Sequence, residues 1–123
     1  MGDLNSKVRN LNNNYPKAIG IDTIGQHNSR GEALAKFCTK NDLVATNTLF
    51  KKCKLFTWIS PDGETKNQID FILTRQSSPR QTIKNCSTLN YPNISDHKML
   101  RSIIKINFSW STKNASIIRY DVE

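Results

Sequence analysis

The chain has 123 residues, enough for one compact domain with its own core but too few for two independently folding domains. Its formal net charge of +8 favours a polyanionic partner, because a basic surface concentrates phosphate-bearing ligands. Three cysteines without C-x-x-C spacing argue against a disulfide framework or a structural zinc site, and no apolar run approaches the roughly 20 residues of a membrane span. We therefore expect an intracellular protein without a membrane segment.

The first half of the chain is predicted to contain one helix and one strand. Residues 8–27 carry asparagines, glycines and isolated charges without a period, which predicts a long surface loop. Ser29–Glu32 has the S-x-x-E form of a capping box, so a helix should begin there. Segment 43–48, apolar and partly β-branched, predicts a buried strand. The helix should span three to four turns, with one apolar face formed by Ala33, Leu34, Phe37 and Cys38.

The second half of the chain is predicted to be rich in strands. Segments 55–59 and 68–74 flank a turn that contains proline and glycine, so they most simply form an antiparallel hairpin. A weaker strand is predicted at 82–89 and a final strand at 98–108. Together with the helix, these strands predict the α/β (α+β) class, with a mostly antiparallel sheet and a covering helix.

Two acid-bearing motifs stand out by their surroundings. Asp3 and Asn5 point to the same side of the chain if the segment is extended, and could then orient and deprotonate a water molecule. The alternative is that they cap a turn. Asp70 lies between Ile69 and Phe71, and a carboxylate in so apolar a run needs a partner, since an unpaired buried charge is very costly.

His97 is the expected partner of Asp70, because a carboxylate fixes the tautomer of an imidazole and favours its protonated form. A salt bridge from Asp70 to a lysine is the alternative. Asp96 and His97 would diverge in an extended strand, but in a loop both could reach one pocket, with Asp96 near a metal and His97 near a phosphoryl oxygen. Three separated acid-bearing segments are what a divalent-metal phosphodiester hydrolase would require.

Six short motifs follow one another along the chain in a recognisable order. They are Gly2–Asn5, His27–Glu32, Asn47–Phe50, Thr57–Gly63, Asn67–Asp70 and Ser95–His97. In this order they resemble the endonuclease/exonuclease/phosphatase superfamily, most closely the endonuclease domains of non-LTR retrotransposons and the related craniofacial-development-protein-2-like proteins. The resemblance spans most of the chain.

The resemblance implies a metal-dependent DNA endonuclease, in which Mg²⁺ or Mn²⁺ offsets charge at the scissile phosphate during in-line attack. It implies that Asp3 and Asn5 position the attacking water. It further implies that Asp96 serves the metal and that His97, paired with Asp70, stabilises the phosphate. The residues implied to lie on the nucleic-acid side are Thr57, Lys66 and Asn67.

The chain also departs from this superfamily. There, the Gly-Asp-x-Asn segment falls near the middle of the domain, after a half that supplies another sheet and a metal-binding glutamate. We therefore expect residues 1–108 to be the C-terminal half of a two-sheet sandwich and 109–123 to be a tail or linker. The sheet face left open would favour self-association or binding of the missing half. Activity of the chain alone is expected to be weak or absent.

Three alternatives stay open on the sequence alone. One is a phosphatase of the same superfamily, against which the motif at 57–63 argues, and another is a fragment without a stable fold. The third is a non-catalytic nucleic-acid-binding module that contacts phosphates through its basic residues. The candidate phosphate contacts are Lys51, Lys52, Lys54, Lys66, Arg75 and Arg80. DNA is the expected partner, and a nuclear location is suggested by the resemblance alone.

Overall fold

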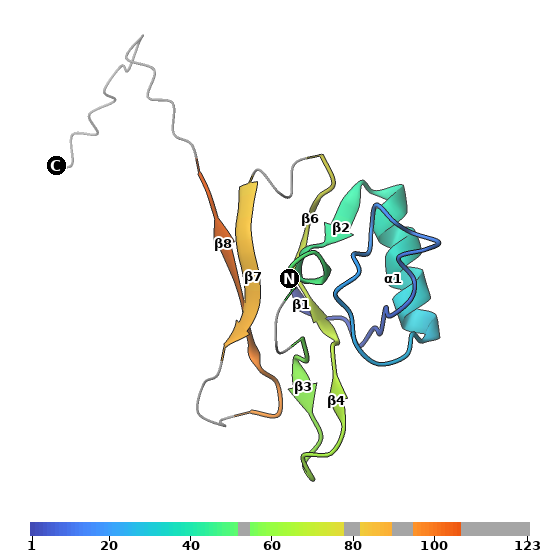
Figure 1. The fold of residues 1–123 in the computed structure, drawn as a ribbon. Coiled ribbons are helices and arrows are strands. Elements are labelled where there is room, and N and C mark those ends of the chain that lie inside the picture. Colours follow the sequence, from blue (N-terminus) through green and yellow to red (C-terminus); the bar gives the residue numbers. More distant parts are fainter. Residues whose placement is uncertain (52–54, 78–81, 90–94, 107–123) are drawn as a thin grey trace, which may run out of the picture.

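The computed structural model describes residues 1–51, 55–77, 82–89 and 95–106 (Figure 1). It contains one α-helix, one short 3-10 helix and eight strands within these residues. In chain order they are β1 (Gly2–Asp3), α1 (Ser29–Lys40), β2 (Leu43–Ala45), η1 (Thr46–Thr48), β3 (Trp58–Ile59), β4 (Lys66–Asn67), β5 (Asp70–Phe71), β6 (Leu73–Arg75), β7 (Ile83–Leu89) and β8 (Met99–Ile104).

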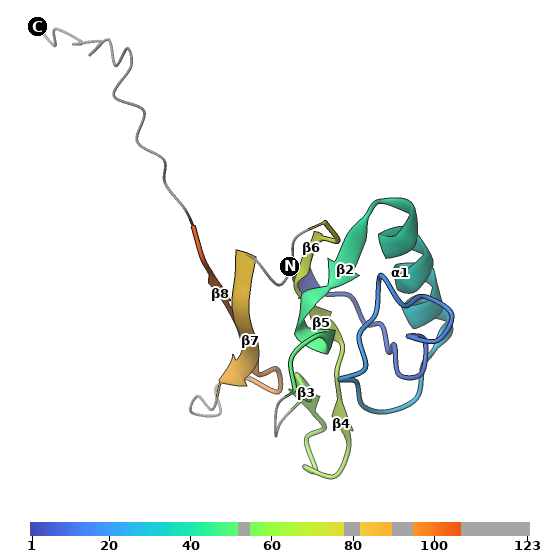
Figure 2. The ribbon, with the colours of Figure 1, turned by 45° about the horizontal axis from the view of Figure 1, so that its top comes forward.

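The strands of the described segments form antiparallel pairs rather than one continuous sheet. β1 pairs with β5, β2 with β6, β3 with β4, and β7 with β8. In both ribbon views α1 lies on one side of β2 and β6, and the β7–β8 hairpin stands on the other side (Figures 1 and 2). Antiparallel strands with one covering helix confirm the predicted α+β class.

The helix α1 begins at Ser29, as predicted, but Asn28 caps it in place of Ser29. Asn28 has an extended backbone, and its side-chain oxygen accepts a hydrogen bond from the Gly31 N–H at 2.8 Å. This satisfies one of the donors that every helix N-terminus leaves unpaired. The predicted apolar face was wrong in part, because Ala33 and Phe37 are exposed. The buried positions of the helix are Gly31, Leu34, Ala35 and Cys38.

Segment 8–27 contains neither helix nor strand, as predicted, but describing it as a surface loop was wrong. Val8, Leu11, Ala18 and Ile19 are each at most 3% exposed, and they pack in one core cluster with residues of α1 and with Phe71. Local backbone hydrogen bonds hold the segment, among them Tyr15 N–H to Leu11 O at 2.8 Å. An irregular segment can enter a core when its own polar groups are paired in this way.

The predicted strands at 43–48 and 68–74 are both shorter in the structure. β2 ends at Ala45, and the next three residues form η1. Part of segment 55–59 does form a hairpin strand, β3, but its partner is β4 and not the predicted segment 68–74; Trp58 lies opposite Asn67. Segment 68–74 is not one strand of that hairpin, because it divides at Ile72 into β5, which pairs with β1, and β6, which pairs with β2. This change of partner places Asp70 beside β1.

The strand β7 confirms the prediction at 82–89, and β8 occupies part of the predicted strand at 98–108. The expected loop at 90–96 lies partly, and the expected tail at 109–123 wholly, outside the described residues. β8 and its continuation carry exposed apolar side chains, which are Met99, Ile103, Ile104 and Ile106. Within the described segments, Cys38 and Cys86 are buried, and no helix there is long and apolar enough to cross a bilayer.

Candidate active site

Asp3 and Asp70 lie opposite each other on the paired strands β1 and β5. Their neighbours hold the strands together, since the Leu4 N–H donates to Ile69 O at 3.0 Å. Phe71 is fully buried in the core, and successive side chains of a strand point to opposite faces, so Asp70 faces away from the core. Its side chain is nevertheless only 15% exposed. A carboxylate so enclosed requires a polar partner.

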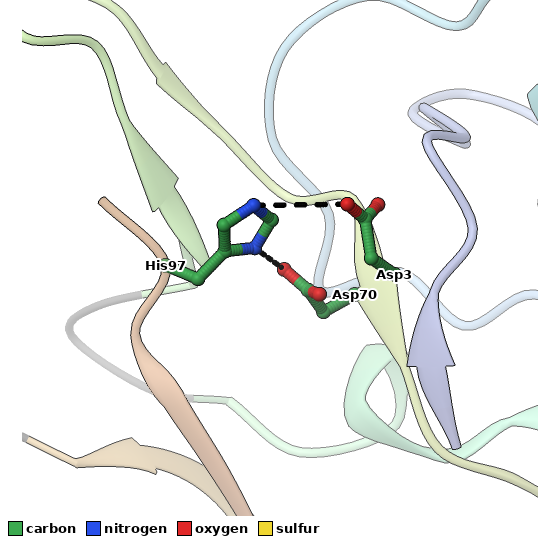
Figure 3. Close-up of side chains that lie close together, drawn as sticks. All are labelled: Asp3, Asp70 and His97. Carbon is green, nitrogen blue, oxygen red and sulfur yellow. Dashed lines mark hydrogen bonds and ion pairs between the residues drawn. The ribbon is translucent and has the colours of Figure 1, made fainter. Parts of the chain in front are cut away.

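That partner is His97, as the sequence predicted. His97 Nδ1 lies 2.9 Å from Asp70 Oδ2, and His97 Nε2 lies 3.6 Å from Asp3 Oδ2 (Figure 3). A carboxylate can only accept a hydrogen bond, so Nδ1 carries the proton that is donated to Asp70. Figure 3 shows both carboxylates on the same side of the imidazole, each facing one of its two ring nitrogens. We call Asp3, Asp70 and His97 the His97 cluster; it joins residues from the two ends of the described chain.

The two carboxylates change the proton affinity of His97. The hydrogen bond to Asp70 is the main cause that raises the pKa of His97 above its ordinary value. Desolvation opposes this rise, whereas the negative charges of Asp70, Asp3 and Asp96 add to it. The cluster therefore favours an imidazolium that is held by Asp70 through one nitrogen and still has a second nitrogen near Asp3.

Asp96 is engaged by a different residue. The Trp58 indole N–H donates to Asp96 Oδ2 at 2.9 Å, and this bond is the main cause that lowers the pKa of the Asp96 carboxyl. Asp96 and His97 thus contact different partners, and the expected convergence of both on one pocket is not seen. Among the described residues, the group of acidic and imidazole side chains close enough to share an ion is the His97 cluster, without Asp96. The metal-binding role of Asp96 stays a prediction.

Asn5 does not continue the extended chain from Asp3. It has a φ of 46°, in the left-handed region that asparagine tolerates better than most residues. Its backbone N–H donates to Asp3 Oδ1 at 2.9 Å, which is the turn-capping geometry that the sequence left as the alternative. The expectation that both side chains point to one side of an extended segment was therefore wrong. Asp3 Oδ2 still faces His97.

The residues expected on the nucleic-acid side differ in their exposure. Thr57 is fully buried, so its side chain cannot touch a nucleic acid in this conformation, and that prediction was wrong. Asn67 is half-buried in β4. Lys66 is exposed, with Nζ 5.0 Å from the centre of the Phe56 ring. Lys66 also lines an open groove of about 570 Å³ together with Ser60, Pro61, Ser95, Asp96 and Lys98.

The His97 cluster has ligating atoms that lie within 4.8 Å of one another. Mg²⁺ prefers oxygen ligands and is commonly held by one or two carboxylates together with substrate phosphate and water. The clustered carboxylates of Asp3 and Asp70 fit this chemistry, although Asp70 already accepts a hydrogen bond from His97, and the carboxylate of Asp96 fits it apart from the cluster. The donor set therefore suits a divalent ion at the carboxylates and leaves the imidazole available for hydrogen bonding.

Over 103 residues, which are 81% of this chain, the sequence is 40% identical to craniofacial development protein 2 of Bos taurus. It is 39% identical over 103 residues to the protein of the same name from Tragulus javanicus. The chain is thus similar to a segment of craniofacial development protein 2. The matched stretch spans 17% of the length of each of these relatives. No protein-family model matches the chain, and no solved structure matches it with statistical significance.

The sequence did not predict the roles of Trp58 and Asn47. An indole N–H that is withdrawn from water usually finds an acceptor. The sequence could therefore have predicted a polar partner for Trp58, but it could not have identified that partner as Asp96. Asn47 is 5% exposed, and its amide bonds to the backbone at Asp70 and Ile72. A buried amide next to a strand gives no periodic signal, and only the fold identifies what it contacts.

Proposed function

We propose that this chain carries part of the active site of a divalent-metal-dependent endonuclease that hydrolyses phosphodiester bonds of DNA. The observation that supports the proposal best is the His97 cluster, in which the two nitrogens of one imidazole face two carboxylates from remote parts of the sequence. The net charge of +8 is also suited to a polyanionic substrate. Similarity to craniofacial development protein 2 agrees with the resemblance found in the motifs.

In the proposed reaction, His97 acts as the hydrogen-bond donor to the phosphate. Asp70 fixes the ring through Nδ1 and raises the pKa of His97, which favours the imidazolium form, in which Nε2 also carries a proton and can donate to a phosphoryl oxygen. Asp3 accepts a hydrogen bond from the attacking water and takes its proton as the new phosphorus–oxygen bond forms and the ester bond breaks. The oxygen of the departing strand then takes up a proton from solvent.

Asp96 would hold the divalent ion, which would offset negative charge on the phosphate when it is bound. A site with one dedicated carboxylate binds Mg²⁺ weakly and relies on substrate phosphate to complete it. We therefore expect slow cleavage from this chain by itself. The groove beside Asp96, where Lys66 is exposed, is the expected path for the neighbouring phosphates.

The proposal is tested by nicking of supercoiled plasmid with the protein in excess, in Mg²⁺ or Mn²⁺ and again in a chelator. We expect slow, chelator-sensitive nicking that is lost in His97→Ala and Asp3→Asn. The matched controls are His27→Ala, which removes the other histidine, and Asp22→Asn, which removes an acid outside the cluster. Nicking that survives in His97→Ala, or that is lost equally in His27→Ala, would contradict the proposal.

A second candidate function is supported by the basic charge of the chain and by the exposed Lys66 in the groove. In this alternative the protein binds nucleic acid without cleaving it. Inert wild-type protein that unfolds cooperatively and binds DNA with a steep, chelator-independent salt dependence would favour this alternative. Binding that is unchanged in Asp96→Ala would favour it further.

A further inference from the structure

The backbone of Asp70 is held by side chains rather than by a second neighbouring strand. In the described part of the chain β5 pairs with β1 alone. The Asp70 N–H donates to Thr57 Oγ1 at 3.1 Å, and the Asp70 carbonyl accepts from Asn47 Nδ2 at 3.1 Å. Both backbone polar groups of the residue that pairs with His97 are therefore bonded to side chains.

The same two side chains also bond to the residues on either side. Thr57 Oγ1 accepts a second hydrogen bond, from the Ile69 N–H at 3.0 Å, and Asn47 Oδ1 accepts one from the Ile72 N–H at 3.2 Å. Thr57 is fully buried and Asn47 is 5% exposed, so neither side chain can rotate freely or exchange these bonds for water. Together they hold the backbone from Ile69 to Ile72 at four points.

These bonds occur where the chain changes its strand partner. Asp70 and Phe71 pair with β1, whereas Leu73–Arg75 pair with β2. The chain at Ile72 therefore cannot complete a regular ladder with either strand. Backbone groups left unpaired in such a partly buried segment are costly, and side chains that supply the missing partners also fix the local direction of the chain. At Asp70 that direction decides where the carboxylate points.

We propose that Asn47 and Thr57 are positioning residues that fix the Asp70 carboxylate in hydrogen-bonding contact with His97. The role of this contact in catalysis rests on the proposed function, whereas the contact between Asp70 and His97 is present in the structure whatever the function. Neither residue touches the imidazole. Each acts through the backbone of Asp70, and a loss of either side chain should allow the carboxylate to move away from Nδ1 while most of the fold remains.

The test is proton NMR of the metal-free protein, because an imidazole Nδ1–H that donates to a carboxylate gives a resonance far downfield of ordinary amides. The His97 resonance is assigned by its loss in His97→Gln. Thr57→Val removes the hydroxyl while preserving the shape of the side chain, and Thr57→Ser restores the hydroxyl. We expect the resonance to disappear or broaden in Thr57→Val and in Asn47→Ala, and to remain in Thr57→Ser.

Thr48→Val is the matched control. Thr48 is also fully buried, and its hydroxyl bonds to backbone groups of Ala45 and Gly20, none of which lies between Ile69 and Ile72. It should lose stability and keep the His97 resonance. A resonance lost equally in both valine variants, kept in Thr57→Val, or absent from the wild type would overturn the proposal.

Thr57→Cys covers the case in which Thr57→Val does not unfold cooperatively, since it removes the methyl group and replaces the hydroxyl with a weaker sulfur acceptor. A wild-type resonance in Thr57→Cys would then overturn the proposal, whereas a broadened resonance would support it. The NMR result is independent of cleavage: expected resonances in a protein that never nicks DNA would leave the positioning role intact and reject the nuclease. Where the wild type nicks plasmid, Thr57→Val should slow cleavage about tenfold or more and Thr48→Val should not.

Discussion

Replacing Asn28 with alanine should destabilise the protein by more than the loss of an ordinary helix cap. The Asn28 side-chain oxygen accepts two hydrogen bonds, from the Gly31 N–H at 2.8 Å and from the Lys7 N–H at 3.1 Å. The backbone of Asn28 adds a third bond, from its N–H to Lys7 O at 3.2 Å. Asn28 therefore joins the start of α1 to the segment that follows Asp3.

The two side-chain bonds set the size of the effect. Loss of an N-cap side chain costs about 1 kcal/mol. Leaving the partly buried Lys7 N–H without an acceptor costs about 1–2 kcal/mol more. Asn28→Ala should thus lower the free energy of unfolding by about 2–3 kcal/mol. Asn28→Asp keeps the acceptor and places a negative charge at the helix N-terminus, so it should stay within about 1 kcal/mol of the wild type.

Urea denaturation followed by circular dichroism measures these differences, with an unchanged slope as the sign that the unfolding transition is comparable. Asn41→Ala is the matched control, because Asn41 lies at the other end of the same helix and its side chain donates one exposed hydrogen bond to Phe37 O. It should cost less than about 1 kcal/mol. The reasoning is refuted if Asn28→Ala costs no more than Asn41→Ala, or if Asn28→Asp is as damaging as Asn28→Ala.

Three further predictions concern single sites. Gly31→Ala should destabilise by about 2 kcal/mol or more instead of adding the usual helix preference for alanine, because its Cβ would meet Lys7 O at 1.7 Å. Cys38 should resist alkylation in the folded protein and react after unfolding, because burial raises the pKa of its thiol to about 11. Because the folded state raises the pKa of His97, that residue's contribution to stability should be complete below its ordinary value of 6.5 and be lost as the pH rises through the folded value. The acids whose negative charges raise the pKa of His97 are Asp70, Asp3 and Asp96.

Each of these three has its own measurement. Thermal melts of Gly31→Ala and Gly2→Ala make a matched pair, since a Cβ at Gly2 meets nothing within 4 Å; equal melting temperatures would contradict the steric argument. Mass spectrometry of alkylated peptides follows Cys38, and rapid labelling in native buffer would contradict its burial. Urea denaturation across a range of pH follows His97, and a pH dependence that His97→Gln leaves unchanged would show that another group is responsible.

Local signals in the sequence predicted the elements better than their packing. The helix start at residue 29 and the strand at 82–89 follow from short-range patterns, and both were found. The buried face of α1 was partly misassigned, because three-to-four spacing favours the large apolar Phe37 over Ala35 as a core residue. In the structure Gly31 lies close to Lys7, so the helix buries the face that carries small residues. Only the tertiary structure contains that constraint.

The part of the site that could be predicted from the sequence is the pairing of a carboxylate with an imidazole. A carboxylate among apolar residues needs a partner, which led from Asp70 to His97. The sequence offered the turn at Asn5 only as an alternative and did not predict the burial of Thr57, because both depend on where neighbouring segments run. Side chains that bond to a distant backbone, such as Asn47, leave no periodic trace in the sequence.

Asp3 and His97 lie near opposite ends of the described chain, yet their side chains are 3.6 Å apart. Contacts between such remote residues form after local helices and hairpins during folding. While the protein is being synthesised, α1 and the β3–β4 hairpin have all of their residues before His97 has been added. An incomplete chain can therefore hold local structure, but Asp3 and Asp70 do not yet have the imidazole of His97 to bind. The His97 cluster can therefore form only after the segment that contains His97 has been synthesised and has folded against β1 and β5.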